Sequence, residues 1–145
     1  TLASERKLLD RFRKRVHGFW QSHGEEPRVG DLEPHVQAAT EEWSGLTDEL
    51  IRAAGEDINH PMGAACEYLD YAGYTVLAWC WARMAVTAGR KLDEAGADRA
   101  FLESKLTTAR FYFDHVLPRA AGLRESIRGS AESLMALDDE QFFMP

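Results

Sequence analysis

Cysteine, proline and long hydrophobic runs are all scarce in this sequence, and each scarcity excludes a class of protein. The 145 residues include only two cysteines and five prolines. Cys66 and Cys80 fall in one expected helix, so a rise of roughly 1.5 Å per residue places them about 21 Å apart. That distance excludes a disulfide between them, because a bridge needs Cα atoms within about 7 Å. The uncharged stretch 71–82 is shorter than the ~20 residues of a membrane span. We therefore expect a reduced, cytoplasmic protein.

Sequence motifs for nucleotide, metal and nucleophile chemistry are also missing. The chain has no G-x-G-x-x-G and no G-x-x-x-x-G-K-[ST] phosphate loop. It has no Glu-x-x-His pair of the di-iron bundles, and its two cysteines and five scattered histidines do not form a zinc pattern. Ser22-His23 and Asp114-His115 are the local hints of a hydrolase, but adjacent residues on a helix point to different sides. We therefore expect no catalytic residue, no cofactor site and no metal site in this chain.

What the sequence does contain is typical of a helical protein. Hydrophobic residues make up 45% of the chain, and alanine, leucine, glutamate and arginine are more frequent than the β-branched residues of strands. The net charge of −7 argues against nucleic acid or an anionic membrane as the main partner. The first 20 residues are the exception, with six basic and two acidic side chains. This basic segment is interpreted mainly as a solvated helix face, and alternatively as a surface that docks on acidic residues of a partner or of the same chain.

The spacing of apolar residues predicts an all-α fold, an antiparallel bundle of about four main helices. The first helix begins near Ser4, and the loop 24–30 after it is a candidate linker. The second helix has Asp31 as its expected N-cap. Its apolar positions alternate in steps of four and three, as in a bundle seam. They are Leu32, Val36, Ala39, Trp43, Leu46, Leu50 and Ala53.

The third and fourth helices are predicted to form the centre of the bundle. The third covers about residues 61–95 and is apolar almost all round at 71–82, which is typical of a helix surrounded by others. One face is expected to carry its core positions: Met62, Cys66, Leu69, Gly73, Val76, Cys80, Met84 and Ala88. The fourth helix starts near Asp98 and should be kinked or broken at Pro118, which lacks a backbone N–H. Its stripe is Leu102, Leu106, Ala109, Phe113, Val116 and Ala120.

Two groups of side chains on these helices have both a structural and a functional interpretation. The aromatic cluster around Tyr68, Trp79 and Trp81 is mainly interpreted as core. The alternative is a pocket for an acyl chain or a flat ring, which a cavity lined by Tyr71, Tyr74 and Trp81 would favour. For Lys105 and Arg110 we favour a partly buried ion-pair network with Glu67 and Asp70. The alternative is a pair of cations that bind phosphate or a carboxylate of a partner.

Two sequence patterns resemble a known domain. One is Ala65-x-x-Tyr68-Leu69, then Gly73-x-x-Val76, then Ala78-Trp79-x-Trp81-x-x-Met84-Ala85. The other is Phe101-x-x-x-Lys105-Leu106-x-x-Ala109-Arg110-Phe111-Tyr112-Phe113-x-x-Val116-Leu117-Pro118. Together they resemble the C-terminal helical domain of large bacterial acyl-CoA dehydrogenases, the group that includes methylmercaptopropionyl-CoA dehydrogenase. The likeness covers residues 31–142, and the basic residues 11–15 before it depart from the pattern.

The resemblance implies a role without chemistry in this chain. In such enzymes FAD takes a hydride from an acyl-CoA while a glutamate removes a proton, and the flavin site and that glutamate belong to preceding domains. The chain would then be a domain cut from a flavoenzyme, a separate subunit that completes one, or a relative with another task. The first two imply the remaining domains or subunit of an acyl-CoA dehydrogenase as partner, and an oligomer.

The sequence thus predicts a basic helix and linker at 1–30 and a helical bundle at 31–145. The alternative function is a protein-interaction module that uses the basic first helix and the apolar tail Phe142-Phe143-Met144, or a small-ligand-binding bundle. Six residues are candidate structural or interface positions: Tyr68, Trp79, Trp81, Lys105, Arg110 and Phe113.

Overall fold

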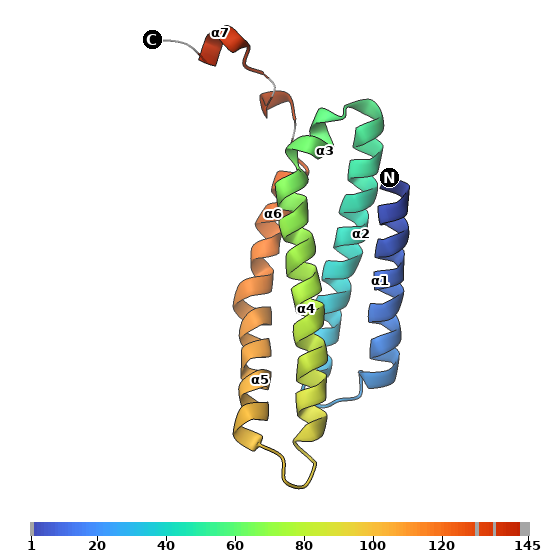
Figure 1. Ribbon diagram of the computed structural model, residues 1–145, viewed down its shortest axis with the longest axis vertical. Helices are drawn as coiled ribbons and strands as arrows, with labels where there is room; N and C mark the ends of the chain where they lie inside the picture. Colours follow the sequence, from blue (N-terminus) through green and yellow to red (C-terminus); the bar gives the residue numbers. More distant parts are fainter. Residues whose placement is uncertain (1, 130, 135, 143–145) are drawn as a thin grey trace.

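The computed structural model describes residues 2–129, 131–134 and 136–142. Residues 2–129 form an up-and-down bundle of four antiparallel rods, and the tail that carries α7 extends away from it (Figure 1). The described residues contain no strand, so the all-α prediction is confirmed. The helices are α1 (Leu2–His23), α2 (Glu33–Glu56), α3 (Asn59–Gly63), α4 (Ala65–Lys91), α5 (Arg99–Phe111), α6 (Ala120–Ile127) and α7 (Asp139–Phe142). The first, second and third rods are α1, α2 and α4, and the fourth is α5 followed by α6.

The starts of the first two helices differ from the prediction. Helix α1 already begins at Leu2, so Ser4 lies inside it and is not the N-cap. Helix α2 follows a 3₁₀ turn, Gly30–Leu32, and has no side-chain cap. Pro34 stands in its first turn, where a missing N–H costs nothing. The carboxylate of Asp31 is therefore not a helix cap, and it pairs with a distant arginine described below.

The third predicted helix is two helices. The short α3 ends at Gly63, and the longer α4 starts at Ala65 and ends at Lys91, four residues before the predicted end at 95. The chain then turns through residues 92–98, where Gly96 has a positive φ of 78° that suits glycine. Asp98 begins the next helix as predicted, because its side chain accepts a hydrogen bond from the Phe101 backbone N–H at 3.1 Å.

The fourth rod breaks near Pro118, as predicted. A π-helical turn, Tyr112–Val116, and a 3₁₀ turn, Leu117–Arg119, separate α5 from α6. Pro118 has no N–H to donate, and in a regular α-helix its ring would collide with the carbonyl four residues earlier. The wider π turn comes directly before the 3₁₀ turn that contains Pro118, and it relieves that conflict.

The core lies between the four rods, and α1 belongs to it. Val16 and Trp20 of α1 are buried in one apolar cluster with Val36 of α2, Trp79 of α4 and Phe113 of the π turn. A second cluster, which includes Leu46, Leu50 and Ile127, fills the end of the bundle near α3. The stripes predicted for the second and fourth helices are mostly buried. The core therefore does not stop at residue 30.

The predicted core face of the third helix is wrong. Met62, Leu69, Val76 and Met84 are exposed, and Ala88 is the buried member of that set. The buried face of α4 instead carries Tyr71, Thr75, Ala78, Trp79, Ala82, Ala85, Val86, Ala88 and Gly89. Both cysteines are free, and Cys66 is exposed. Among the described helices, none has the length and apolarity to cross a membrane.

Candidate functional site

An open groove of about 800 Å³ lies between the end of α1, the second half of α4 and the start of α5. Its apolar lining includes Phe19, Met84 and Phe101, and its charged lining is basic. Arg83, Lys91 and Lys105 line it, and no carboxylate does. The Lys105 Nζ lies 4.9 Å from the centre of the Phe101 ring, a cation–π contact. In a chain of net charge −7, this groove is a local concentration of positive charge beside apolar side chains.

Lys105 and Arg110 do not act as a pair, and the acidic partners predicted for them are wrong. The Arg110 guanidinium holds Asp31 with both terminal nitrogens, and Nη2 lies 2.8 Å from Oδ1. The same nitrogen donates to the backbone carbonyl of Arg28 at 2.8 Å. The hydrogen bonds from Arg110 lower the pKa of the Asp31 carboxyl below its usual range. Arg110 thus binds the loop before α2 to the fourth rod.

Arg28 joins the same loop to the end of α4. Its guanidinium donates to the Gly89 carbonyl at 3.0 Å and to Asp93 at 2.7 Å. It also pairs with Glu26 at 3.1 Å. Val29, between these contacts, is buried. The predicted linker 24–30 is therefore held against the end of α4 and does not act as a free hinge in this structure.

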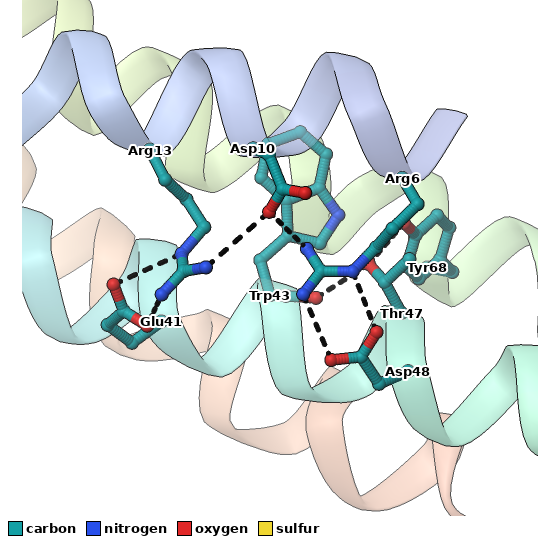
Figure 2. Close-up of polar contacts among 8 residues, drawn as sticks. All are labelled: Arg6, Asp10, Arg13, Glu41, Trp43, Thr47, Asp48 and Tyr68. Atoms are coloured by element: carbon teal, nitrogen blue, oxygen red, sulfur yellow. Dashed lines mark hydrogen bonds and ion pairs between the residues drawn. The ribbon is translucent and has the colours of Figure 1, made fainter. Parts of the chain in front are cut away.

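The basic first helix docks on the acidic side of α2, one of the two interpretations of this segment (Figure 2). The Arg6 Nε lies 2.8 Å from Asp48, and another nitrogen of Arg6 bonds Asp10 at 2.9 Å. Arg13 pairs with Glu41 through two hydrogen bonds. The other four basic side chains are exposed, so the segment is part solvated face and part docking surface. They are Lys7, Arg11, Lys14 and Arg15.

The aromatic candidates are spread through the core. Trp79 is 5% exposed and receives edge contacts from Phe12 and Phe19, and Phe113 is buried in the same cluster. Trp81 is half-buried against that cluster. Tyr68 belongs to the second cluster, where its hydroxyl lies 2.7 Å from Thr47 Oγ1 (Figure 2).

The tyrosines do not favour the predicted ligand pocket. Tyr71 is buried among apolar side chains, and Tyr74 packs against both main clusters. Burial raises the pKa of the Tyr71 phenol to about 12. Tyr112 is also buried, which raises its pKa to about 12, and it donates a hydrogen bond to the Tyr74 carbonyl at 2.7 Å. Tyr71 and Tyr74 are therefore part of the packing of the apolar clusters, as the main interpretation of the aromatic residues predicts.

Residues 12–138 match the family described as acetyl-CoA dehydrogenase C-terminal like. The chain belongs to this family. The match begins inside α1, earlier than the resemblance seen from residue 31, and it runs through all four rods. A comparison with curated proteins finds no match to the chain.

In this acetyl-CoA dehydrogenase C-terminal-like domain, the weak hints of chemistry in the sequence can be located in the structure. No group of three or more histidine, cysteine or acidic residues in it could hold a metal ion. The serine–histidine neighbours predicted as the weak hydrolase hint both bond to their own helix. Ser22 Oγ donates to the Gly18 carbonyl at 3.3 Å, and a ring nitrogen of His23 lies 2.9 Å from the Phe19 carbonyl.

The described residues of the domain also do not fit a flavin. Two buried side-chain donors lack a partner, the indole N–H groups of Trp20 and Trp43. Neither tryptophan lines the groove described above, and the groove itself is open along its length. A flavin needs an enclosing site with several directed polar groups, and this groove is not of that kind.

Sequence reasoning missed the residues that fasten the domain together. Asp31 and Arg110 are 79 positions apart, and Arg128 of the last rod joins Glu49 and Glu42 of α2 at 2.8 and 2.9 Å. Helical spacing reports which residues share a face of one helix, but it does not report which face of another helix lies opposite. The abundance of arginine in the sequence is the one signal that such long-range ion pairs exist.

Proposed function

We propose that this chain is the non-catalytic C-terminal domain of an FAD-dependent acyl-CoA dehydrogenase and that it stabilises the enzyme by packing against the remaining domains or a companion subunit. The family match across residues 12–138 carries this proposal. FAD, bound by the other domains, would supply the hydride acceptor. The residues of this chain would contribute apolar burial and the rigidity of the bundle.

The end of the bundle near α3 is suited to that contact. Ile58, Met62 and Leu134 are large apolar side chains that are all exposed there. Leu134 packs over Gly63, which joins the tail segment to α3. Burial of such side chains stabilises an assembly by roughly 25 cal/mol per Å² of apolar surface. A contact at this end would leave the four rods unchanged.

The proposal extends to the acyl-CoA substrate of the full enzyme only by its chemical class. The resemblance to the methylmercaptopropionyl-CoA dehydrogenase group supports a short or modified acyl chain as the substrate of the full enzyme. No residue identified in this chain selects the acyl group, so that choice would belong to the domains that bind the flavin.

The test is reconstitution with a flavoprotein. The purified chain is mixed with the FAD-loaded catalytic core of an acyl-CoA dehydrogenase, and the mixture is separated by size-exclusion chromatography with light scattering. We expect a stoichiometric complex and release of FAD at a temperature several degrees higher than in the core alone. Met62→Glu should weaken the complex, while Thr107→Glu, on the exposed side of α5, should not. Stoichiometric FAD binding and acyl-CoA oxidation by the lone chain, or separate elution of the two proteins, would contradict the proposal.

The alternative of an interaction module has lost part of its basis. Arg6 and Arg13 of the basic helix already bind acidic residues of α2. Phe143 and Met144 of the apolar tail lie outside the described residues, and so does the side chain of Phe142. The reconstitution above also distinguishes the two functions, because an unrelated interaction module would not raise the temperature of flavin release.

A further inference from the structure

A small pocket of about 230 Å³ lies at the seam between α2 and the start of α6. The 3₁₀ turn that contains Pro118 forms part of its wall. Alanines on both helices leave room there, because they have no side chain beyond Cβ: Ala38, Ala39, Ala120 and Ala121. Neither Tyr74 nor Trp81 lines it, so it is not the aromatic pocket considered from the sequence. Sites for drug-sized ligands measure roughly 300–1,000 Å³, so this pocket suits a smaller molecule.

Tyr71 of α4 reaches this pocket from the core. The residue is 5% exposed and belongs to the second apolar cluster. Its hydroxyl makes no hydrogen bond to any described residue. In the described chain, the fully enclosed side-chain donors without a partner are the indoles of Trp20 and Trp43, and the Tyr71 hydroxyl is not among them. The hydroxyl is therefore accessible from the pocket that the residue lines, and it is free to bond a molecule there.

Two opposite charges with unused atoms line the pocket beside that hydroxyl. Arg124 of α6 donates to Glu125 through Nε at 3.0 Å, and its two terminal nitrogens make no hydrogen bond within the described chain. Glu42 of α2 accepts from Arg128 through Oε1 at 2.9 Å, and its Oε2 accepts no hydrogen bond from a described residue. Burial raises the pKa of the Tyr71 phenol to about 12, the Glu42 charge adds to that rise, and Arg124 opposes it. Both charges therefore lie near the phenol.

These free groups specify the chemistry of a ligand. The Arg124 guanidinium presents two nitrogens, which can bind a carboxylate by two parallel hydrogen bonds. The Tyr71 hydroxyl can donate to the same carboxylate, and the free Glu42 oxygen can accept from an ammonium. A carboxylate alone would lie near the Glu42 charge, and an amine alone would lie near Arg124. A zwitterion satisfies both charges, and the neighbouring alanines and Leu117 suit a short apolar substituent.

We propose that the pocket between α2 and α6 binds a small α-amino acid, with its carboxylate on Arg124 and Tyr71 and its ammonium on Glu42. The proposal goes beyond the proposed function and does not depend on it, because the contact with other domains uses the α3 end of the bundle. The bound molecule would join α2 to the fourth rod directly after the break at Pro118. Because it binds only the folded chain, it should also raise the temperature of unfolding.

The first experiment titrates the full chain with three related molecules and follows binding by two-dimensional amide NMR. L-valine carries both charges, isovalerate lacks the ammonium, and isobutylamine lacks the carboxylate. With valine we expect saturable shifts of the backbone signals of Ala39, Tyr71 and Ala120. Isovalerate and isobutylamine should each bind at least about tenfold more weakly, because each leaves one charge of the pocket without a partner.

Two matched pairs of variants test the charges. Arg124→Gln should weaken valine binding at least about tenfold, while Arg119→Gln should not, because Arg119 is exposed on the same rod and does not line the pocket. Glu42→Gln should also weaken binding. Its control is Glu49→Gln, which removes the other carboxylate bonded to Arg128 but lies outside the pocket, and which should leave the affinity unchanged.

Tyr71→Phe separates binding from packing. The variant keeps the ring in the core and removes a hydroxyl that has no partner in the described chain, so urea denaturation should show no loss of stability. Its affinity for valine should fall at least about fivefold, because one hydrogen bond to the carboxylate is lost. Its affinity for isobutylamine, which has no carboxylate, should change less.

Three results would overturn the proposal: no saturable shift with valine, equal affinity for valine and isovalerate, or unchanged valine binding in both Arg124→Gln and Tyr71→Phe. Shifts confined to residues away from the α2–α6 seam would overturn it as well. Complex formation with a flavoprotein core is measured separately, so the failure of either inference leaves the other testable.

Discussion

The two faces of α4 are both apolar, but the inner face is buried in the core and the outer face is exposed to solvent. The inner face consists mostly of small residues, among them Ala78, Ala82 and Ala85, which are fully buried. The outer face carries Leu69, Leu77 and Met84, which are larger and exposed. Small side chains let α5 and α6 pack close to α4, because helix separation depends on the side chains at the contact. On a helix that is apolar all round, side-chain size therefore indicates the inner face better than hydrophobicity does.

The largest effect is expected from removing the largest ring of the inner face. Trp79→Ala should lower the free energy of unfolding by about 3–5 kcal/mol, because it leaves a cavity between Phe12 and Phe19. Urea denaturation followed by circular dichroism measures this change. A loss below about 1 kcal/mol would mean that the inner face is less tightly packed than the structure indicates, and would break the contrast between the two faces.

The buried phenols should make the inner side of the bundle sensitive to alkali. Burial raises the pKa of Tyr71 and Tyr112 to about 12, while unfolded tyrosine titrates near 10. The folded state therefore keeps both phenols protonated where the unfolded state loses its protons. The resulting stability is fully present below about pH 10 and is lost as pH rises toward 12.

Urea midpoints measured between pH 9 and 11.5, with tyrosinate absorbance as a second signal, check this expectation. Tyr112→Phe should make the alkaline decline shallower, since it removes one of the two raised phenols. It should also cost stability at neutral pH, because the hydrogen bond to the Tyr74 carbonyl is lost. A decline of unchanged slope in the variant would contradict the assignment.

A smaller effect is expected from removing the Asp31–Arg110 ion pair, which lies outside the inner face of α4. Arg110→Met should cost roughly 0.5–1 kcal/mol at pH 7, because the Asp31–Arg110 pair is partly exposed to solvent. Arg110 lowers the pKa of Asp31, so this stability is present above the unfolded pKa near 3.9 and is lost as pH falls through the folded pKa. The difference between wild type and variant should shrink in acid. Asp31→Asn serves as the control, and a difference that stays constant with pH would count against this cause.

The smallest effect is expected on the outer face itself. Leu69→Ser should change the free energy of unfolding by no more than about 0.5 kcal/mol, because Leu69 is exposed. The measurement is urea denaturation of the purified variant, followed by circular dichroism. A loss comparable to that of Trp79→Ala would show that Leu69 is covered by its own chain, and the distinction between the faces would disappear.

Much of the fold was predictable from local patterns. Apolar residues spaced three and four positions apart identified the buried stripes of α2 and α5. Both helices also carry charged positions, so each has one distinct apolar face. The break at Pro118 followed from the chemistry of proline. For α4 the same method selected the wrong side, because residues 71–82 have no charged position to mark the solvent. The end of α3 at Gly63 was missed for a related reason, since no strong stop signal separates it from α4.

The candidate residues were harder to place than the helices. Tyr68, Trp79, Trp81 and Phe113 lie in or against the apolar clusters, where their composition alone suggested they would be. The partner of Arg110 depended on how the loop before α2 folds back, and no spacing rule joins residues 31 and 110. The predicted role of the six candidate residues in contacts with other domains stays a prediction.

The clasp formed by Arg28 and Arg110 has a consequence for the integrity of the polypeptide. Two guanidinium groups hold the connection between α1 and α2 to the carbonyl of Gly89, to Asp93 and to the fourth rod. Val16 and Trp20 anchor α1 in the interior independently of that connection. A protease that cut between Gly24 and Pro27 would therefore produce two pieces that stay together as one folded particle under native conditions and separate only in denaturant.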